Sequence, residues 1–310
     1  MNAQPLNLVK LAQDFANEDD ARAYLEALRW PDGPVCPHCG AQGAYRITPR
    51  KPGAKTRPGL LKCKAKGCRK QFTVTVGTIF EDSHIPLSKW LLAVHLLCAS
   101  KKGMSAHQVH RMLGLTYKTA WFMCHRIRYA MTQEPLRSKL SGIVEVDETY
   151  VGGKVRGTKR GKRDKPPVVA LVQRGGEVRA FPMPQVTEKN LREAIRQHVD
   201  PSARVMTDGH YAYRDLGTEF AEHQAVSHDR LEWVRGDAHT QTVEGYFSLL
   251  KRGITGVYHH VGEGHLHRYV DEFTFRYNRR HVEDGVRAAL AIKGAEGKRL
   301  MLRDPASDGS

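Results

Sequence analysis

Two sets of side chains in this sequence combine residue types and spacings that bind metal ions. The first set is cysteines: Cys36 and Cys39 form one short-spaced pair, and Cys63 and Cys68 form another. Two such pairs are typical of a tetrahedral zinc site of the ribbon type, because each turn presents two thiolate sulfurs. The surrounding segment has few large apolar side chains, so the metal would supply much of its folding free energy. We predict one structural Zn²⁺ ion on these four cysteines; the alternative is four unrelated free thiols.

The second set is carboxylates at the ends of predicted strands and helices. Alternation along residues 143–151 (IVEVDETYV) places Glu145 and Asp147 on one face of a strand and Glu148 on the other. Asp208 closes the stretch ARVMTD, and residues at strand ends line the ligand crevice of open α/β sheets. Glu244 lies in the first turns of a predicted helix, beside its apolar stripe.

Carboxylate oxygens of this kind bind Mg²⁺ and leave positions for water and phosphate. Two such ions can activate the attacking oxygen and stabilise the leaving oxygen of an in-line phosphoryl displacement. Asp147, Asp208 and Glu244 are therefore candidate metal ligands. Glu145 shares the predicted face of Asp147 and is the rival to it.

The elements that must position these acids follow from hydrophobic periodicity and turn residues. Strands are predicted at residues 143–151, 202–208 and 220–228, together with a hairpin around Gly175 and Gly176. Helices are predicted at residues 187–199, 241–254 and 265–280. This order predicts an α/β fold with a mixed sheet flanked by helices. Upstream, residues 7–29 are predicted to be helical, and residues 86–131 end in two helices around a turn at Gly114 that suit a helix-turn-helix.

The charge of the chain indicates a nucleic-acid partner. Its 310 residues carry a formal charge of +16, from 49 Lys and Arg against 33 Asp and Glu. Residues 36–80 contain ten basic residues and no acid, and residues 154–165 (KVRGTKRGKRDK) form a second basic run. Surfaces that meet phosphate backbones need such an excess, whereas enzymes of small metabolites rarely do. The alternative is a basic surface that serves solubility.

Other classes fit the sequence less well. The first residues lack the basic-then-apolar pattern of a signal peptide, and the longest apolar run, residues 90–99, is too short to span a bilayer. Cysteines paired for metal suit a reducing compartment. We therefore expect a cytoplasmic protein with no membrane partner and no small-molecule substrate.

Several motifs, taken in this order, make the chain resemble a known family. They are LRWPDGPVCPHCG, LGLTYKTAWFMCHRIR, VEVDETYVGGK, VMTDGHYAY, HTQTVEGYFSLLKRGITGVYHHV and HLHRYVDEFTFRYNRR, and they span roughly residues 20 to 290. They resemble bacterial insertion-sequence transposases of the ISXO2-like type, which have an N-terminal zinc ribbon and an Asp-Asp-Glu triad. One position departs from the pattern, since members often have Asn where this chain has Gln241.

The resemblance implies a fold, an activity and a set of residues. It implies a ribonuclease H-like catalytic domain with Asp147, Asp208 and Glu244 as the catalytic triad that binds two Mg²⁺ (or Mn²⁺) ions. It implies cleavage at the ends of an insertion sequence, transfer of the freed strand into target DNA, and a homo-oligomer on paired double-stranded ends, close to the bacterial nucleoid. The predicted DNA contacts are Lys118, Arg126, Lys154, Lys159, Arg160, Lys162, Arg163, Lys251, Arg252 and Arg276.

The predicted organisation has five parts. They are an N-terminal helical segment (1–33), a zinc ribbon (34–80), a helix-turn-helix region (86–132), the catalytic domain (140–290) and a disordered tail (297–310). Three alternative functions stay open at this point. A ribonuclease H-like nuclease would cut DNA without joining it, and a non-catalytic DNA-binding regulator would have lost the chemistry. A zinc-ribbon transcription accessory factor would leave residues 142–280 unexplained.

Overall fold

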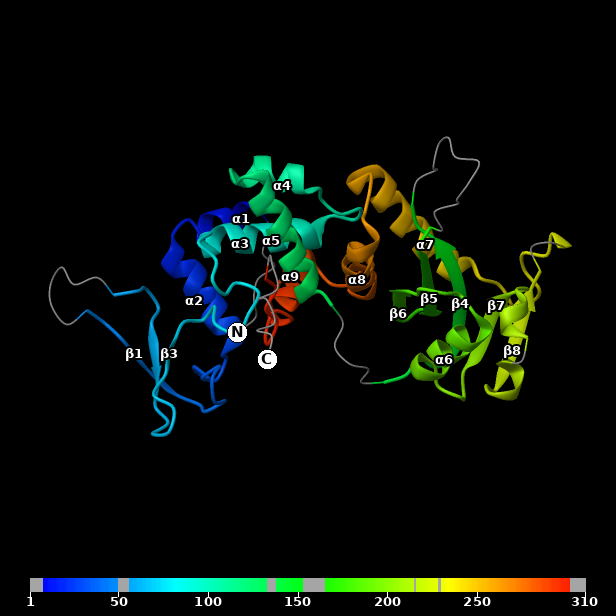
Figure 1. The fold of residues 1–310 in the computed structure, drawn as a ribbon, viewed down its shortest axis with the longest axis horizontal. Coiled ribbons are helices and arrows are strands. Elements are labelled where there is room, and N and C mark those ends of the chain that lie inside the picture. The colour runs from blue at the N-terminus through cyan, green and yellow to red at the C-terminus, as the bar shows by residue number, and fades with distance from the viewer. Residues whose placement is uncertain are drawn as a thin grey trace, which may run out of the picture. The chain divides into compact units, whose positions relative to one another are not determined.

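Two units make up the chain in the computed structural model, which describes residues 8–49, 56–132, 138–152, 165–214, 216–227 and 230–301 (Figure 1). Met1–Met131 and Val282–Ser310 form the first unit, and Thr132–His281 forms the second. The second unit is therefore an insertion between two stretches of the first. None of the described helices has both the length and the apolar character needed to cross a membrane.

A mixed five-stranded sheet forms the centre of the second unit. Its strands are β4 (Ile143–Tyr150), β5 (Pro167–Gln173), β6 (Val178–Pro182), β7 (Arg204–Asp208) and β8 (Glu222–Val226), in the order β6-β5-β4-β7-β8. β4, β5 and β6 pair antiparallel, whereas β7 runs parallel to β4 and β8 runs parallel to β7. The predicted hairpin is β5–β6, and its Gly175 has the positive φ of 71° that glycine adopts without strain. The mixed sheet flanked by helices is the α/β architecture that the sequence predicts.

Helices cover both faces of this sheet (Figure 1). α6 (Glu188–His198) packs on one face, where Leu191 and Ile195 join Val144, Val146 and other strand residues in one core. The other face is covered by α7 (Gln241–Gly253) and α8 (Leu266–Asn278). Short helical turns complete the unit: η1 (Tyr211–Tyr213), η2 (Leu216–Thr218), the π-helix η4 (Ile254–Tyr258) and η5 (Glu263–His265).

Side chains of β4 alternate between these two cores. Val144 and Val146 face α6, while Val151 belongs to the core under α7 and α8. Glu145 contacts the N-terminus of α7, and Glu148 bonds Tyr213 on the α6 side. The strand therefore points Glu145 and Asp147 toward α7 and Glu148 away from it, as a side-chain period of two requires.

The first unit combines helices with a small antiparallel sheet. The helices are α1 (Leu8–Asp14), α2 (Glu18–Arg29), α3 (Leu87–Ala99), α4 (Ala106–Leu113), α5 (Tyr117–Ala130) and α9 (Asp284–Lys293). The sheet has the order β1-β2-β3 and consists of β1 (Ala44–Arg46), β2 (Leu61–Cys63) and β3 (Gln71–Phe72). α3 lies at the centre, in contact with α1, α2, α4, α5 and α9. This position explains why α3 is apolar on nearly all sides.

Local capping defines the pair α4–α5. Ser105 and Gln108 form a reciprocal capping box at the start of α4. Gly114 ends α4 in the left-handed conformation, with φ of 60° and ψ of 43°. Thr116 then caps α5 by accepting a hydrogen bond from the Thr119 amide. The two helices around Gly114 are therefore present, while their use as a DNA-reading motif stays a prediction.

The C-terminal part of the chain differs from the prediction. The sequence predicts a catalytic domain that runs to residue 290, but α9 packs on α3 in the first unit and the second unit ends at His281. The predicted tail is also held at its start, where the Gly297 amide donates to Gly77 O and Arg299 pairs with Asp82. Residues 302–310 and most of the predicted basic loop lie outside the described residues.

Candidate functional site

Asp147 and Asp208 lie near the carboxyl ends of two neighbouring parallel strands. β4 and β7 pair from Ile143 opposite Arg204 to Glu145 opposite Met206, and Asp147 and Asp208 each lie two residues further along their strands. Burial and, after it, the negative charge of Asp208 raise the pKa of Asp147, so the two carboxyl groups are close enough to repel each other. Because Glu145 and Met206 share the face toward α7, both aspartates point to that face.

Glu244 approaches the same face from the first turn of α7. Val243, Phe247, Leu250 and Ile254 bury the predicted stripe of this helix against the sheet. Glu244 lies beside this stripe and is exposed. Its negative charge also raises the pKa of Asp147, and its Oε1 accepts a 2.9 Å hydrogen bond from the Thr240 hydroxyl. The charges of Asp208 and Glu244 both act on Asp147, so the three predicted acids lie in one region of this face of the sheet.

The cluster of acids changes the protonation of Asp147. Burial, the charge of Asp208 and the charges of Glu148 and Glu244 together raise the pKa of the Asp147 carboxyl to about 7, against the hydrogen bond it accepts from the Glu148 amide. Half-buried carboxylates that repel one another form an oxygen-rich, negative environment, and a divalent cation relieves this repulsion. The oxygen donors and their mutual repulsion suit a divalent cation, although the three carboxylates do not lie as close together in this structure as a bound ion requires.

Glu148 forms a fourth acidic group, which the sequence assigns no role. Its Oε2 accepts a 2.5 Å hydrogen bond from the Tyr213 hydroxyl on the α6 side of the sheet. Burial is the main cause of its raised pKa, and the charge of Asp208 adds to it. The buried Tyr213 phenol in turn has a pKa well above its ordinary value, because burial and the carboxylate both oppose its ionisation. Glu148 and Tyr213 support the acidic cluster from behind the sheet.

Two histidines that flank the acids in the sequence, His210 and His239, have local structural contacts. Nδ1 of His210 accepts from the Ala212 amide and caps η1, while the His210 amide donates to Asp208. Nδ1 of His239 lies 3.2 Å from Oε1 of Glu145. Both histidines therefore help to shape the segments that carry the acids.

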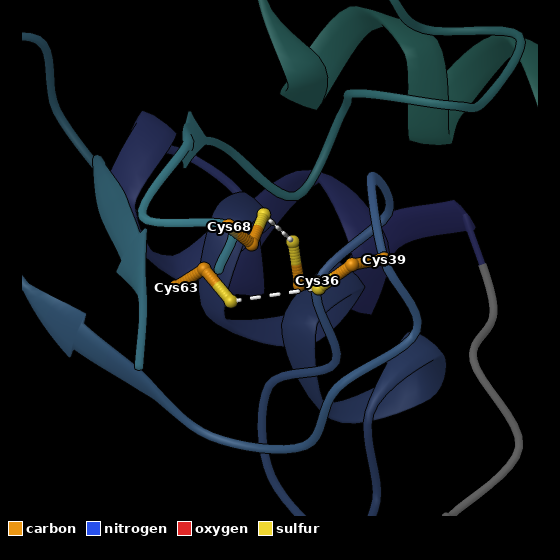
Figure 2. Close-up of side chains that lie close together, drawn as sticks. All are labelled: Cys36, Cys39, Cys63 and Cys68. Atoms are coloured by element: carbon orange, nitrogen blue, oxygen red, sulfur yellow. Dashed lines mark hydrogen bonds between the residues drawn. The ribbon is translucent and has the colours of Figure 1, made fainter. Parts of the chain in front are cut away.

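Four cysteines form the second candidate site (Figure 2). Sγ of Cys36 lies 3.8 Å from Sγ of Cys68, and Sγ of Cys39 lies 3.7 Å from Sγ of Cys63. In a tetrahedral site with Zn–S bonds of about 2.3 Å, neighbouring sulfurs are roughly 3.8 Å apart. The observed distances therefore fit the edges of a zinc tetrahedron. Among the described residues, this is the one group of three or more metal-ligating side chains already close enough to hold an ion.

The backbone around the cysteines forms two turns that present the sulfurs. The Gly40 amide donates to Cys36 O, and the Cys36 amide donates to Ala41 O. In the second turn the Cys68 amide donates to Ala65 O. His38, which lies between Cys36 and Cys39 in the sequence, bonds Gln71 O at 3.3 Å and is not part of the sulfur cluster.

Comparisons with known proteins identify the family. Residues 139–278 match the family model of the ISXO2-like transposase domain, and residues 16–71 match that of the transposase zinc-ribbon domain. The chain is 30% identical over 285 residues to an uncharacterised protein in the transposable element ISH50 of Halobacterium salinarum, covering 84% of this chain and 91% of that protein. The chain belongs to the ISXO2-like transposase family. Its four-cysteine cluster is the zinc site of the ribbon.

One solved structure is also similar to this transposase-family chain. It is the cryo-electron microscopy structure of a simian T-cell lymphotropic virus intasome in complex with PP2A regulatory subunit B56 gamma. The similarity covers 57% of this chain and 71% of that chain, at 17% sequence identity and a TM-score of 0.29.

The basic residues predicted to contact DNA fall into three groups in this transposase-family chain. Lys118, Lys251 and Arg252 are exposed on α5 and α7, so their charges are available to phosphates. The loop residues Lys154, Lys159, Arg160, Lys162 and Arg163 lie outside the described residues.

Arg126 and Arg276 form the third group, and their surroundings do not support a DNA contact. Arg126 is 6% exposed, lies over the rings of Trp90 and Phe122, and donates to Glu81 O. Arg276 is 7% exposed and pairs with the buried Glu272. Both guanidinium groups are used inside the fold, so these two predictions are corrected to structural roles.

Proposed function

We propose that this chain is a DNA transposase that cuts at the ends of an insertion sequence and joins the freed strand to target DNA. The observation that carries the proposal is the placement of Asp147, Asp208 and Glu244. Asp147 lies within β4, Asp208 is the last residue of the parallel neighbour β7, and Glu244 lies in the first turn of α7; the charges of Asp208 and Glu244 both reach Asp147. The family supplies the context in which such acids act, and we propose the ribonuclease H-like fold for the second unit.

The three acids would hold the Mg²⁺ ions of the reaction. When bound, these ions lower the pKa of an attacking water or hydroxyl and neutralise charge on the phosphate. Asp147 has a raised pKa in the absence of metal, so it would lose its proton as the site fills. Glu244 would exchange its hydrogen bond to Thr240 for the metal, which is an easy change for an exposed side chain.

DNA binding would involve both units. On α5, Lys118 lies one residue after the first residue of the helix, the position from which a recognition helix reaches base edges and phosphates. On α7, Lys251 lies seven residues after Glu244, about two turns later, so it lies on nearly the same side of the helix as the acid. We propose that Lys118 binds the element end and that Lys251 binds phosphate next to the cleaved bond. Pairing of two ends by a homo-oligomer in the cytoplasm, close to the nucleoid, belongs to the same proposal.

The test is a cleavage and joining assay with Asp147→Asn, Asp208→Asn and Glu244→Gln. The substrate is a duplex with the DNA that flanks the coding region, and a pre-cut duplex reports joining by itself. Each variant should cut and join more than about 10²-fold more slowly, because a ligand to the ions supplies part of several kcal/mol of charge stabilisation. DNA affinity, measured by fluorescence anisotropy, should stay within about twofold.

The control is Asp200→Asn, a partly exposed acid of the same unit that accepts a hydrogen bond from the Ser202 hydroxyl, and this variant should cut normally. Retained Mg²⁺-dependent nicking by a pure triad variant would refute the assignment of the acids. Cutting without joining of pre-cut ends would favour a nuclease. Tight DNA binding with no metal-dependent chemistry in the unmodified protein would favour a regulator.

A further inference from the structure

Glu145 has the most unusual environment of the acids on β4. Its side chain is fully buried, with 0% exposure, in the strand that carries Asp147. A buried carboxylate is stable only when charged and polar donors satisfy its oxygens. The donors around Glu145 therefore show what this position does.

Four donor groups and one imidazole nitrogen surround the two oxygens of Glu145. Oε2 accepts from the backbone amides of Thr242 at 2.7 Å and Val243 at 3.0 Å. Oε1 lies 2.8 Å from the Thr242 hydroxyl, 2.6 Å from Nε of Arg174 and 3.2 Å from Nδ1 of His239. An ionised carboxylate has about four lone-pair positions, so none remains for a metal ion. This excludes Glu145 as the rival to Asp147 for the metal.

The two backbone amides belong to the first turn of α7, where helix amides have no partner within the helix. A side chain at the residue before the helix commonly caps them. In α7 that residue is Thr240, which makes no capping bond and donates its hydroxyl to Glu244 instead. Glu145 caps the helix from the neighbouring strand, and this arrangement leaves Thr240 available to hold Glu244.

Arg174 extends the connection to the segment that precedes α7. Its Nε donates to Glu145, while its other two guanidinium nitrogens donate to Asp237 O at 2.8 Å and His239 O at 3.0 Å. Arg174 follows β5, and its amide bonds Ile143 O at the start of β4. The strand, the hairpin and the approach to α7 are thus fixed to one carboxylate.

We propose that Glu145 is a positioning residue that fixes the first turn of α7 against β4 and so sets the position of Glu244 relative to Asp147 and Asp208. Glu145 lies two residues from Asp147 on the same face of β4, and its amide partners Thr242 and Val243 lie directly before Glu244. The carboxylate of Glu145 therefore connects the strand that carries Asp147 to the helix turn that carries Glu244. The inference rests on the proposed function for its catalytic meaning, while the structural connection stands by itself.

The first measurement is hydrogen exchange of residues 241–247 in the metal-free, full-length protein. Glu145→Gln keeps the shape of the side chain but removes its charge and places an NH₂ group against donors. Amide bonds to a charged group are worth roughly a factor of 10 to 100 in an opening equilibrium, so exchange at Thr242 and Val243 should accelerate by about that factor. Thr242→Val removes only the hydroxyl donor and folds more safely, and it should accelerate exchange by roughly 2- to 10-fold.

The matched control is Glu272→Gln. Glu272 of α8 is likewise fully buried; it pairs with Arg276 and accepts a hydrogen bond from Tyr258 of η4, which follows the C-terminal end of α7. This variant should lower the stability of the unit while exchange at residues 241–247 stays unchanged. If Glu272→Gln accelerates that exchange as much as Glu145→Gln does, the effect is general loosening and the proposal is wrong.

The second measurement separates positioning from metal binding. With saturating DNA and Mn²⁺, Glu145→Gln should cut about 10²-fold more slowly, the cost of a misplacement near 1 Å, while DNA affinity stays unchanged. A variant with normal exchange but weaker Mn²⁺ binding by calorimetry would make Glu145 a ligand and overturn the proposal. If the unmodified protein cuts no DNA, the proposed function fails, and the exchange result still decides the role of Glu145 in holding α7.

Discussion

Neutralising Asp147 should stabilise the metal-free protein above pH 7. Burial and neighbouring acids raise the pKa of this carboxyl to about 7, whereas an aspartate in an unfolded chain titrates near 3.9. The difference of roughly 3 pKa units corresponds to about 4 kcal/mol at 1.36 kcal/mol per unit. Asn has nearly the same shape and no charge, so Asp147→Asn should recover on the order of 2 to 4 kcal/mol of stability for the second unit at pH 8.

The direction of the pH dependence follows from linkage. Below about pH 4, Asp147 is protonated in both states and costs no stability. As pH rises from about 4 to 7, the unfolded chain loses the proton while the folded chain keeps it, so the free energy of unfolding falls. Above about 7 the full cost is present. The stability difference between variant and parent should therefore grow between pH 4 and 7 and then level off.

The assay is urea unfolding in EDTA at several pH values, followed by hydrogen exchange in β4 and β7, which reports the second unit separately from the first. The control is Asp200→Asn, where the Ser202 hydroxyl and amide lower the pKa of the carboxyl. A lowered pKa means that the ionised carboxyl of Asp200 stabilises the folded state at neutral pH. The Asp200→Asn variant should therefore become less stable than the parent protein as pH rises. Both substitutions replace an aspartate carboxyl by an amide, but they should change the free energy of unfolding in opposite directions.

A stability difference that stays flat between pH 4 and 8 would refute the reasoning, since the carboxyl would then titrate alike in both states. Mg²⁺ gives a second check. It should stabilise the parent protein at pH 8, because the cation offsets the repulsion around Asp147. The Asp147→Asn variant should respond to Mg²⁺ much less.

Three further predictions concern zinc, a DNA contact and a buried arginine. A strong chelator should release one Zn²⁺ per chain, measured with a colorimetric zinc reagent. The double variant Cys36→Ser with Cys63→Ser should unfold the ribbon and weaken DNA binding. Unchanged DNA affinity of this variant would show that the ribbon serves only the fold. Lys251→Ala should weaken DNA binding by roughly 2- to 10-fold in low salt, with little change in melting temperature, because it removes one exposed phosphate contact. Arg126→Ala should instead lower the melting temperature, because the guanidinium no longer packs on Trp90, and should change DNA binding little. Equal effects of the two substitutions on DNA binding would contradict the separate roles assigned to them.

Much of the fold could be predicted from the sequence because the residues that define each of its predicted elements lie close together in the chain. The hairpin at Gly175, the helix pair around Gly114 and the apolar stripe of α7 each depend on residues a few positions apart. The cysteine spacing likewise predicted the sulfur cluster, since each turn of a zinc ribbon is defined by its own sequence.

Residues whose partners lie far away in the chain could not be assigned in this way. Glu145 caps a helix that begins 96 residues later in the sequence. Because this partner is so distant, the alternation of Glu145 with Asp147 predicted the correct face of the strand but wrongly suggested Glu145 as an alternative metal ligand. Arg126 has the charge of a DNA contact, but it lies over the ring of Trp90, 36 residues earlier in the sequence. α9 carries no motif, and its partner α3 lies nearly 200 residues earlier.

The return of the chain to its first unit has a consequence for synthesis on the ribosome. α3 is apolar on nearly all sides, and α9 covers part of it, with Arg287 donating to Cys98 O. At 5 to 20 residues per second, roughly 10 to 40 s pass between translation of α3 and of α9. During that interval the second unit can fold, while the first keeps an apolar surface uncovered. A nascent or truncated chain that lacks α9 would thus hold a folded candidate active site beside an incomplete first unit, which makes it a substrate for chaperones and proteases.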